Sequence, residues 1–129
     1  MKAFRLSITV GFLLLSLLFT TVYSDDPPPT PVSGQIAFVS YQDGNSDIYV
    51  MNADGTNQRR LTEDKNRQFN PSWSPDGTQI AYFTYLQDVY NLYVMNADGT
   101  QQRRLADDVM DAEEGPAWSP DGLQIAYIR

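Results

Sequence analysis

Neither cysteine nor histidine occurs in the 129 residues of this chain. Without cysteine the chain forms no disulfide, so its stability must come from packing, a metal or partners. Without histidine it lacks Ser-His-Asp and Cys-His catalysis and the commonest zinc ligands. Carboxylate pairs could in principle hydrolyse glycosides, but no spacing in the sequence selects such a pair. We therefore expect a chain that is not an enzyme, with no catalytic residue, cofactor or metal site.

Positive charge is scarce as well. The chain has 9 Lys and Arg against 16 Asp and Glu, which gives a net charge of −7. Binding of nucleic acid through its phosphates needs a basic surface, so this charge excludes a nucleic-acid partner.

Only one long apolar run is present, and it lies near the N-terminus. Lys2 and Arg5 precede the apolar residues 8–19, and small polar residues follow. This order predicts a secretory signal peptide over residues 1–24, cleaved after Ser24. The alternative is an uncleaved N-terminal anchor, although the apolar stretch is shorter than the roughly 20 residues needed to span a bilayer. Either interpretation predicts an exported protein, periplasmic or secreted, that meets the membrane only through this segment.

Residues 25–33 read DDPPPTPVS. Four prolines in nine residues cannot form a helix or a central strand. We expect this segment to be a stiff linker that precedes the domain of residues 34–129.

The rest of the chain repeats itself. Asp47–Thr56 returns as Asn91–Thr100 after 44 residues, and Trp73–Gly77 returns as Trp118–Gly122 after 45. The triplet Ile-Ala-aromatic recurs in phase with both. A period of roughly 40–50 residues built of short strands and turns is typical of a β-propeller.

Within one repeat we predict four strands, joined by tight turns at Ser74–Gly77 and Asp98-Gly99 and by a loop at 86–88. Residues 80–83 are apolar without alternation, so both faces of this strand must be covered. Such a sheet lies between two neighbouring sheets, as a propeller blade does. The predicted class is all-β, an incomplete propeller of four-stranded antiparallel blades. The expected strands are 71–74, 78–84, 89–96 and 101–105.

These motifs, Trp-Ser-Pro-Asp-Gly above all, resemble the TolB-type β-propeller, a family of WD-like Pro-Asp repeats. Trp73–Gly77, Ile80–Tyr82, Leu92–Gly99 and Arg103–Leu105 match one blade in order, and the resemblance covers residues 34–129. Bacterial members of this family lie in the periplasm or outside the cell. The best known is a partner in an envelope complex, and others are attached to serine peptidases or to carbohydrate-active enzymes.

The blade count departs from the family. About two and a quarter blades are present, whereas propellers close with four to eight. We favour a truncated or partial gene product, with a strand-exchanging homo-oligomer as the alternative. In such an oligomer the predicted strand 123–129 would duplicate residues 34–40 of the next subunit. The isolated chain is expected to fold poorly or to associate, because its terminal blade faces are uncovered.

The resemblance implies an exported, non-catalytic module that binds proteins, or envelope polymers, through its inter-blade loops. Its partner would lie in the cell envelope or the extracellular space. The alternatives are a segment of a larger exported hydrolase and a carbohydrate-binding propeller.

Two groups of side chains are candidates for binding. The densest charge lies in a predicted loop between blades and would suit a cation or a basic partner, or simply be solvated: Asp107, Asp108, Asp111, Glu113 and Glu114. Exposed aromatic contacts are expected from Tyr41, Tyr85 and Tyr90.

Aspartates in tight turns, such as Asp76 and Asp121, are expected to cap local backbone N–H groups rather than form a binding ring. Residues 43–47 resemble the start of a calcium loop, but Ile48 stands where glycine is required, so we do not expect an EF-hand.

Overall fold

The computed structural model divides the chain into two units, Met1–Thr30 and Pro31–Arg129, and describes residues 34–109 and 112–128. The predicted signal peptide, the linker and Asp111 lie outside the described residues. The part of the chain that is described contains no helix that could span a lipid bilayer.

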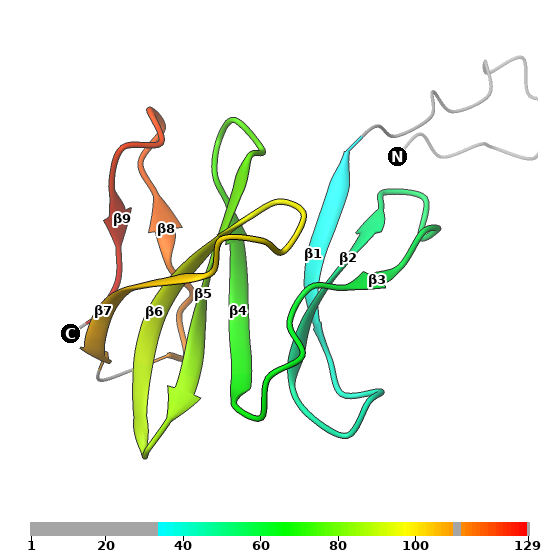
Figure 1. The fold of residues 1–129 in the computed structure, drawn as a ribbon. Coiled ribbons are helices and arrows are strands. Elements are labelled where there is room, and N and C mark those ends of the chain that lie inside the picture. Colours follow the sequence, from blue (N-terminus) through cyan, green and yellow to red (C-terminus); the bar gives the residue numbers. More distant parts are fainter. Residues whose placement is uncertain (1–33, 110–111, 129) are drawn as a thin grey trace, which may run out of the picture. The chain divides into compact units, whose positions relative to one another are not determined.

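The described residues form three antiparallel sheets (Figure 1). The first has the order β1-β2-β3, the second β4-β5-β6-β7, and the third pairs β8 with β9. The strands are β1 (Gln35–Ser40), β2 (Asp47–Asn52), β3 (Arg59–Arg60), β4 (Arg67–Trp73), β5 (Gln79–Leu86), β6 (Val89–Asn96), β7 (Arg103–Val109), β8 (Ala117–Trp118) and β9 (Ile125–Ala126). Strands β4 to β7 make the one complete four-stranded blade of the described residues, as the repeat predicts.

The boundaries of four strands differ from the prediction. Strand β5 continues to Leu86, the first residue of the predicted loop at 86–88, because it pairs with β6 as far as Val89. Strand β7 continues to Val109, so Asp107 and Asp108 belong to a strand and not to the predicted loop. The reason is the length of β6, whose first residues remain available for pairing, so that Tyr90 lies opposite Val109 beyond two register shifts. Strand β4 begins at Arg67, four residues earlier than predicted, and β9 is shorter than the predicted strand over 123–129.

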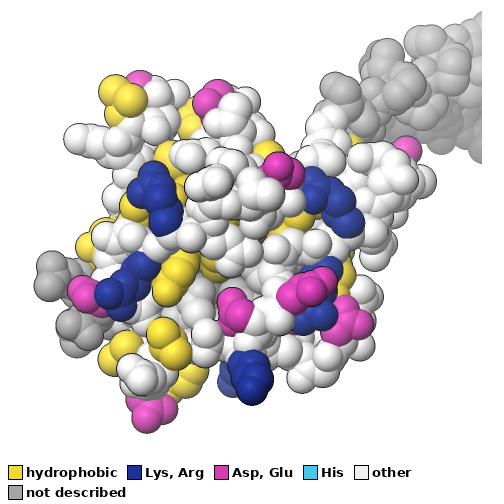
Figure 2. Space-filling view, in the orientation of Figure 1, with side chains coloured by type: hydrophobic (Ala, Val, Ile, Leu, Met, Phe, Trp, Pro, Cys, Tyr) yellow, Lys and Arg dark blue, Asp and Glu magenta, His cyan; other side chains and the backbone are white. Residues whose placement is uncertain are grey.

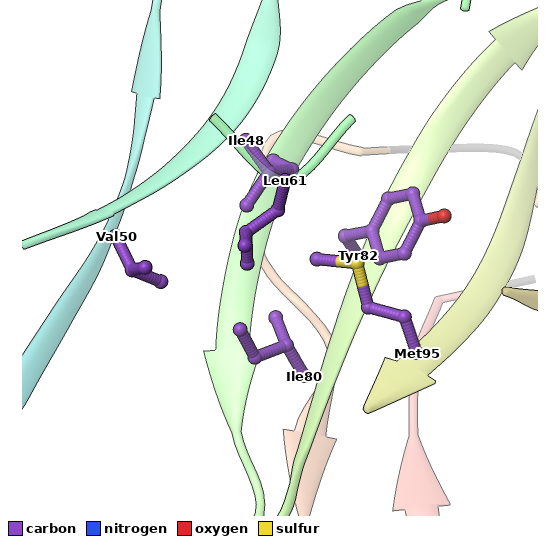
Figure 3. Packing of buried hydrophobic residues seen from close by; sticks show 6 residues of the cluster. All are labelled: Ile48, Val50, Leu61, Ile80, Tyr82 and Met95. Atoms are coloured by element: carbon purple, nitrogen blue, oxygen red, sulfur yellow. The ribbon is translucent and has the colours of Figure 1, made fainter. Parts of the chain in front are cut away.

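Strand β5 is buried on both faces. Ile80 and Tyr82 pack toward the first sheet, in a cluster with Ile48, Val50, Leu61 and Met95 (Figure 3). The intervening side chains, Ala81 and Phe83, belong to a second cluster with Leu92 and Val109, against which Trp118 and Ile125 of the third sheet pack. The run of apolar residues without alternation is thereby explained, because a sheet covers each face.

Polar contacts also join neighbouring sheets. The Arg59 guanidinium donates to the carbonyl oxygens of Ala97, at 3.0 Å, and of Asp98, at 3.2 Å. These carbonyls lie in the β6–β7 hairpin, so β3 of one sheet holds the turn of the next. The Trp118 indole Nε1 donates to the Ser72 carbonyl at 3.1 Å and joins β8 to β4.

Gly55 and Gly99 occupy equivalent hairpin turns with φ of 83° and 91°. A methyl group on Gly55 would meet nothing within 4 Å, whereas one on Gly99 would lie 3.0 Å from the Leu61 carbonyl oxygen. We expect Gly55→Ala to lower the free energy of unfolding by about 1–2 kcal/mol through backbone strain alone. Gly99→Ala should lower the free energy of unfolding by about 1–3 kcal/mol more than Gly55→Ala, because the added carbon presses on the backbone of the preceding blade.

Urea unfolding of the full chain, followed by tryptophan fluorescence at one protein concentration, measures this difference. Equal losses in the two variants would show that the hairpin of 97–100 does not press on the first sheet.

Candidate functional site

Four connections meet at one end of the sheets, the lower end in Figure 1. They are residues 41–46 between β1 and β2, residues 63–66 in the connection from β3 to β4, residues 87–88 between β5 and β6, and residues 112–116, the described part of the connection from β7 to β8. Antiparallel order brings them together, because Arg67 lies opposite Tyr85 and Tyr90 lies opposite Val109. We call the described residues of these connections, with the strand ends that carry them, the loop rim. Acidic and basic side chains are interspersed over this half of the molecule (Figure 2).

The rim carries all three predicted tyrosines. Tyr85 and Tyr90 are cross-strand partners whose ring centroids lie 4.9 Å apart, and both are half-buried. Tyr90 also meets Phe69 edge to face, at 5.9 Å. Tyr41 lies on the neighbouring sheet's connection and is 60% exposed. The structure thus brings two tyrosines into one aromatic cluster and presents the third separately.

The Tyr85 hydroxyl points to a carboxylate. It donates to Asp88 Oδ1 at 3.3 Å. Burial raises the pKa of Tyr85, and the negative charge of Asp88 raises it further. The phenol is therefore a hydrogen-bond donor and not an acid at neutral pH.

The predicted acidic residues are spread along the rim. Asp107 is exposed on β7, whose backbone also includes Asp108, while Glu113 and Glu114 are exposed in the connection to β8. The Asn70 side-chain amide donates to the Ala112 carbonyl at 2.5 Å, and the Glu113 carbonyl lies 3.3 Å away. This contact ties the acidic connection to β4.

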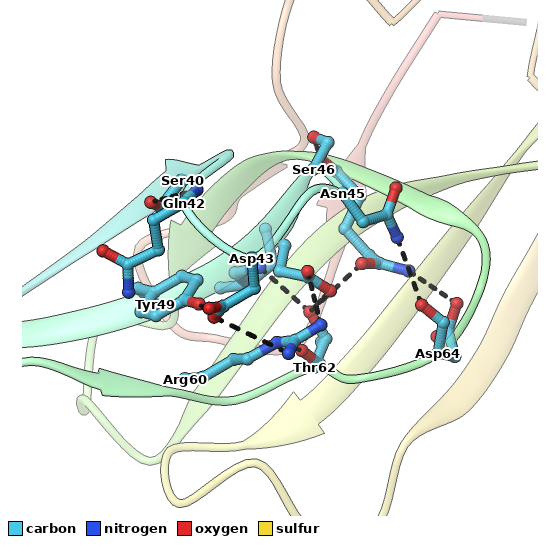
Figure 4. A network of polar contacts seen from close by, with 12 residues as sticks. Ser40, Gln42, Asp43, Asn45, Ser46, Tyr49, Arg60, Thr62 and Asp64 are labelled. Atoms are coloured by element: carbon cyan, nitrogen blue, oxygen red, sulfur yellow. Dashed lines mark hydrogen bonds and ion pairs between the residues drawn. The ribbon is translucent and has the colours of Figure 1, made fainter.

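A buried polar network beneath the rim was missed by sequence reasoning (Figure 4). Asp47 is fully buried, and its Oδ2 accepts a hydrogen bond from Arg60 Nη2 at 2.7 Å. The second guanidinium nitrogen of Arg60 lies 3.6 Å from Asp43 Oδ2. The Tyr49 hydroxyl donates to Asp43, and this hydrogen bond raises the pKa of Tyr49. One arginine therefore joins two carboxylates of the first sheet.

Thr62 extends this network toward β4. Its hydroxyl oxygen accepts the Ile48 backbone N–H at 2.9 Å and lies 3.1 Å from Gln68 Oε1. The Gln68 amide nitrogen donates to Asp64 Oδ1 at 2.8 Å. Ser46 donates to the Gln68 carbonyl at 2.5 Å. Connections 41–46 and 63–66 are thus fixed to each other and to the start of β4.

Residues 43–47, which resemble the start of a calcium loop in sequence, take part in this network instead. The Asp43 and Asp47 carboxylates are engaged by Arg60 and Tyr49. Nowhere in residues 34–109 and 112–128 do three or more acidic side chains converge as metal ligands. The acidic spacing is visible in the sequence, but the arginine that neutralises it lies 13 residues beyond Asp47.

The second repeat lacks this network. Asn91 stands where the first repeat has Asp47, and Ala106 stands in place of Thr62. Arg104 Nη1 lies 3.5 Å from Asn91 Oδ1, a long contact between a cation and a neutral amide. The two repeats therefore share a backbone but not this ion pair.

The turn aspartates serve their own turns, as the sequence predicts. Asp76 Oδ1 accepts from the Thr78 backbone N–H at 3.0 Å and from the Ser74 hydroxyl at 2.6 Å. The Ser74 hydrogen bond, followed by those from Thr78, lowers the pKa of Asp76 below its ordinary value of 3.8. Equivalent contacts lower the pKa values of Asp54, Asp98 and Asp121.

Comparison with known proteins gives the same architecture. The model of the TolB beta propeller domain matches residues 23–129. The chain belongs to the TolB β-propeller family. It is 44% identical over 62 residues to the Tol-Pal system protein TolB of Geobacter sulfurreducens, and 38% identical over 45 residues to that of Syntrophotalea carbinolica. These matches cover 43% and 35% of this chain, but only 14% and 10% of those proteins.

Solved structures support the same fold. The putative TolB from Agrobacterium tumefaciens has a TM-score of 0.59 at 26% identity, covering 72% of this chain and 33% of that one. TolB from Acinetobacter baumannii has a TM-score of 0.65 at 20% identity, covering 77% of this chain and 26% of that one, which speaks for the fold alone. The TolB-like chain thus corresponds to a part of the propellers that it resembles.

The ion pair of the first repeat can be tested against the second. Arg60→Met removes the partner of the fully buried Asp47 and should lower the free energy of unfolding by a few kcal/mol, roughly 3–5 at most. Arg104→Met removes a long contact to a neutral amide, and the loss should stay below about 1 kcal/mol. Urea unfolding of both variants measures the difference. Asp47→Asn combined with Arg60→Met should recover part of the loss, and equal losses in the single variants would contradict the pairing.

The turn aspartates predict a loss of stability in acid. Because the folded pKa of Asp76 is depressed, its contribution is present above pH 3.8 and is lost as the pH falls through the folded value. Asp76→Asn keeps an acceptor oxygen but does not titrate, so its unfolding free energy should fall less steeply between about pH 5 and pH 3. Asp107→Asn, which removes an exposed charge outside the turns, is the control. Parallel pH profiles for the wild type and Asp76→Asn would refute the role given to this turn.

Proposed function

We propose that this chain is an exported, non-catalytic TolB-like module that binds a protein partner of the cell envelope through its loop rim. The observation that carries the proposal is the combination of tyrosines and carboxylates on a rim whose connections are held by a buried polar network. Tyr41 is 60% exposed, and Glu113 and Glu114 are exposed on the same rim. Tyrosine suits a protein interface because its ring packs while its hydroxyl stays hydrated.

The network favours binding because it limits what must be ordered on association. Asn45 Nδ2 donates to the Asn66 carbonyl at 2.7 Å, and Ser46 is bound to the start of β4. Loops that are already held in place lose less conformational freedom when a partner docks. The carboxylates add electrostatic complementarity to a partner with basic groups, which speeds association and selects among partners.

The names of the relatives suggest which partner to test. Both curated relatives are named as proteins of the Tol-Pal system. We infer that this chain meets a component of that system in the periplasm, after export directed by residues 1–24. The arrangement of Lys2, Arg5 and the following apolar run supports the export step.

The test places a photo-crosslinking amino acid at Tyr41 or Tyr85 of the full chain, expressed in a cell that makes the Tol-Pal proteins. Matched control positions are Thr56 and Thr100, which lie in the hairpin turns at the opposite end of the sheets. We expect crosslinks to a Tol-Pal component from the rim positions and not from the controls, because the partner covers one end only. Equal crosslinking from both ends, or none from the rim, would reject the rim as the binding surface.

Affinity can then be measured with the purified component that was crosslinked. Tyr85→Ala should weaken binding by about tenfold, as expected for an interface aromatic residue whose truncation costs more than 1 kcal/mol. Raising the salt concentration should also weaken binding, because the rim carboxylates face solvent and salt screens their attraction to the partner.

A further inference from the structure

The inner edge of β1 lacks a paired strand among the described residues. In the complete blade, β5 pairs with β4 on one side and with β6 on the other. Strand β1 is the counterpart of β5, since Ile36-Ala37 aligns with Ile80-Ala81, yet β1 pairs with β2 alone. A strand edge of this kind exposes N–H and C=O groups that can pair with another segment.

The buried indole nitrogen of Trp73 is a second indication that β1 can accept another strand at its inner edge. Trp118 of β8 donates its Nε1–H to the Ser72 carbonyl of β4, the innermost strand of the preceding sheet. Trp73 of β4 is the equivalent residue one blade earlier, but its Nε1 is buried and has no hydrogen-bond partner among the described residues. Among the described residues, no innermost strand of the first sheet supplies a carbonyl to accept this hydrogen bond. A cavity of about 430 Å³ lies there, lined by Gly34, Gln35, Trp73 and Gly77.

Strand β8 has the pairing register that a strand beside β1 would need. Strand β8 pairs with β9 through Ala117 opposite Ala126 and Trp118 opposite Ile125. In the complete blade, Ser72 lies opposite Ala81 and Trp73 opposite Ile80, which is the same register. Because β9 and β1 carry the same Ile-Ala-aromatic triplet, β8 can pair with β1 in the register that it uses with β9.

We propose that β8 of a second copy of this chain completes the first sheet by pairing with β1. In this arrangement Ala117 of the second copy lies opposite Ala37, and Trp118 lies opposite Ile36. The Ala117 carbonyl then accepts the Trp73 indole N–H, as the Ser72 carbonyl accepts that of Trp118. Strand β1 of the first copy replaces β9 of the second.

Two features favour this occupant. At the spacing of β4, Pro28 and Pro29 stand where β4 has Ser72 and Trp73, and these two prolines have no backbone N–H to donate to a ladder. The β8–β9 pairing that must be given up involves only two residue pairs, and β1 can replace both of them in the same register. Leu123, in the turn that joins β8 to β9, is 82% exposed. The contact is head-to-tail, so repeated association builds a ring or a filament.

Cysteine crosslinking tests the pairing directly, because the chain has no cysteine of its own. Full-length Ala37→Cys and Ala117→Cys chains with different tags are coexpressed and oxidised. We expect a disulfide between the two chains to be the main product, since paired strands bring Cα atoms within disulfide range. Thr56→Cys with Ala117→Cys is the control for collisions or association through the N-terminal segment, and Ser72→Cys/Ala81→Cys in one chain is the positive control.

The pairing is refuted if the Ala37→Cys and Ala117→Cys chains crosslink no more than the collision control while the positive control forms. It is also refuted if Pro28→Cys and Ala37→Cys crosslink within one chain, because the preceding residues would then fill the edge.

The indole N–H gives an independent measurement. Trp73→Phe removes the donor and should weaken association by about fivefold, the effect of one neutral hydrogen bond. Its Ser72→Cys/Ala81→Cys crosslink should be unchanged, which separates loss of association from loss of folding. An association constant that Trp73→Phe leaves unchanged would overturn the proposed bond. The outcome is independent of the loop rim, so either proposal can fail without the other.

Discussion

Burial of β5 on both faces is the constraint on which the remaining structure depends. Ile80 needs the first sheet and Phe83 needs the third, so the complete blade is stable only between neighbours. Burial of large apolar side chains of this kind contributes about 1.5–3 kcal/mol each. The polar contacts between sheets, such as that of Arg59 with the Ala97 carbonyl, set the angle and register of a stack that apolar burial holds together.

Much of this arrangement could be predicted from the repeat in the sequence. The strand predicted over 89–96 coincides with β6, and the turn at Ser74–Gly77 is where the structure places it. Period and turn chemistry are local, and local signals locate hairpins well. The predicted end of β7 was wrong because the length of this strand depends on how far β6 remains available for pairing. Val109 stands between two aspartates and Met110, and this context gave no sign that it would anchor the strand at 3% exposure.

In the candidate site, too, some features could be predicted from the sequence and others could not. The rim tyrosines could be found from their places beside predicted loops, whereas the ion pair of Asp47 and Arg60 could not. An aspartate before an apolar strand looks like a turn residue or a metal ligand until the hairpin brings the arginine of β3 beside it. The second repeat, with Asn91 and Ala106 at the corresponding positions, gave no pattern to follow. Contacts made by one repeat only are invisible to reasoning from periodicity.

The hydrogen bond from Trp118 to the Ser72 carbonyl has a consequence for the order in which the chain folds. Its acceptor lies 46 residues nearer the N-terminus than its donor, and chains are synthesised from that end. The complete blade therefore presents the Ser72 carbonyl before Trp118, which will bind it, has been made. A newly synthesised blade thus waits with one face uncovered until the next tryptophan arrives. Assembly along the chain is therefore directional.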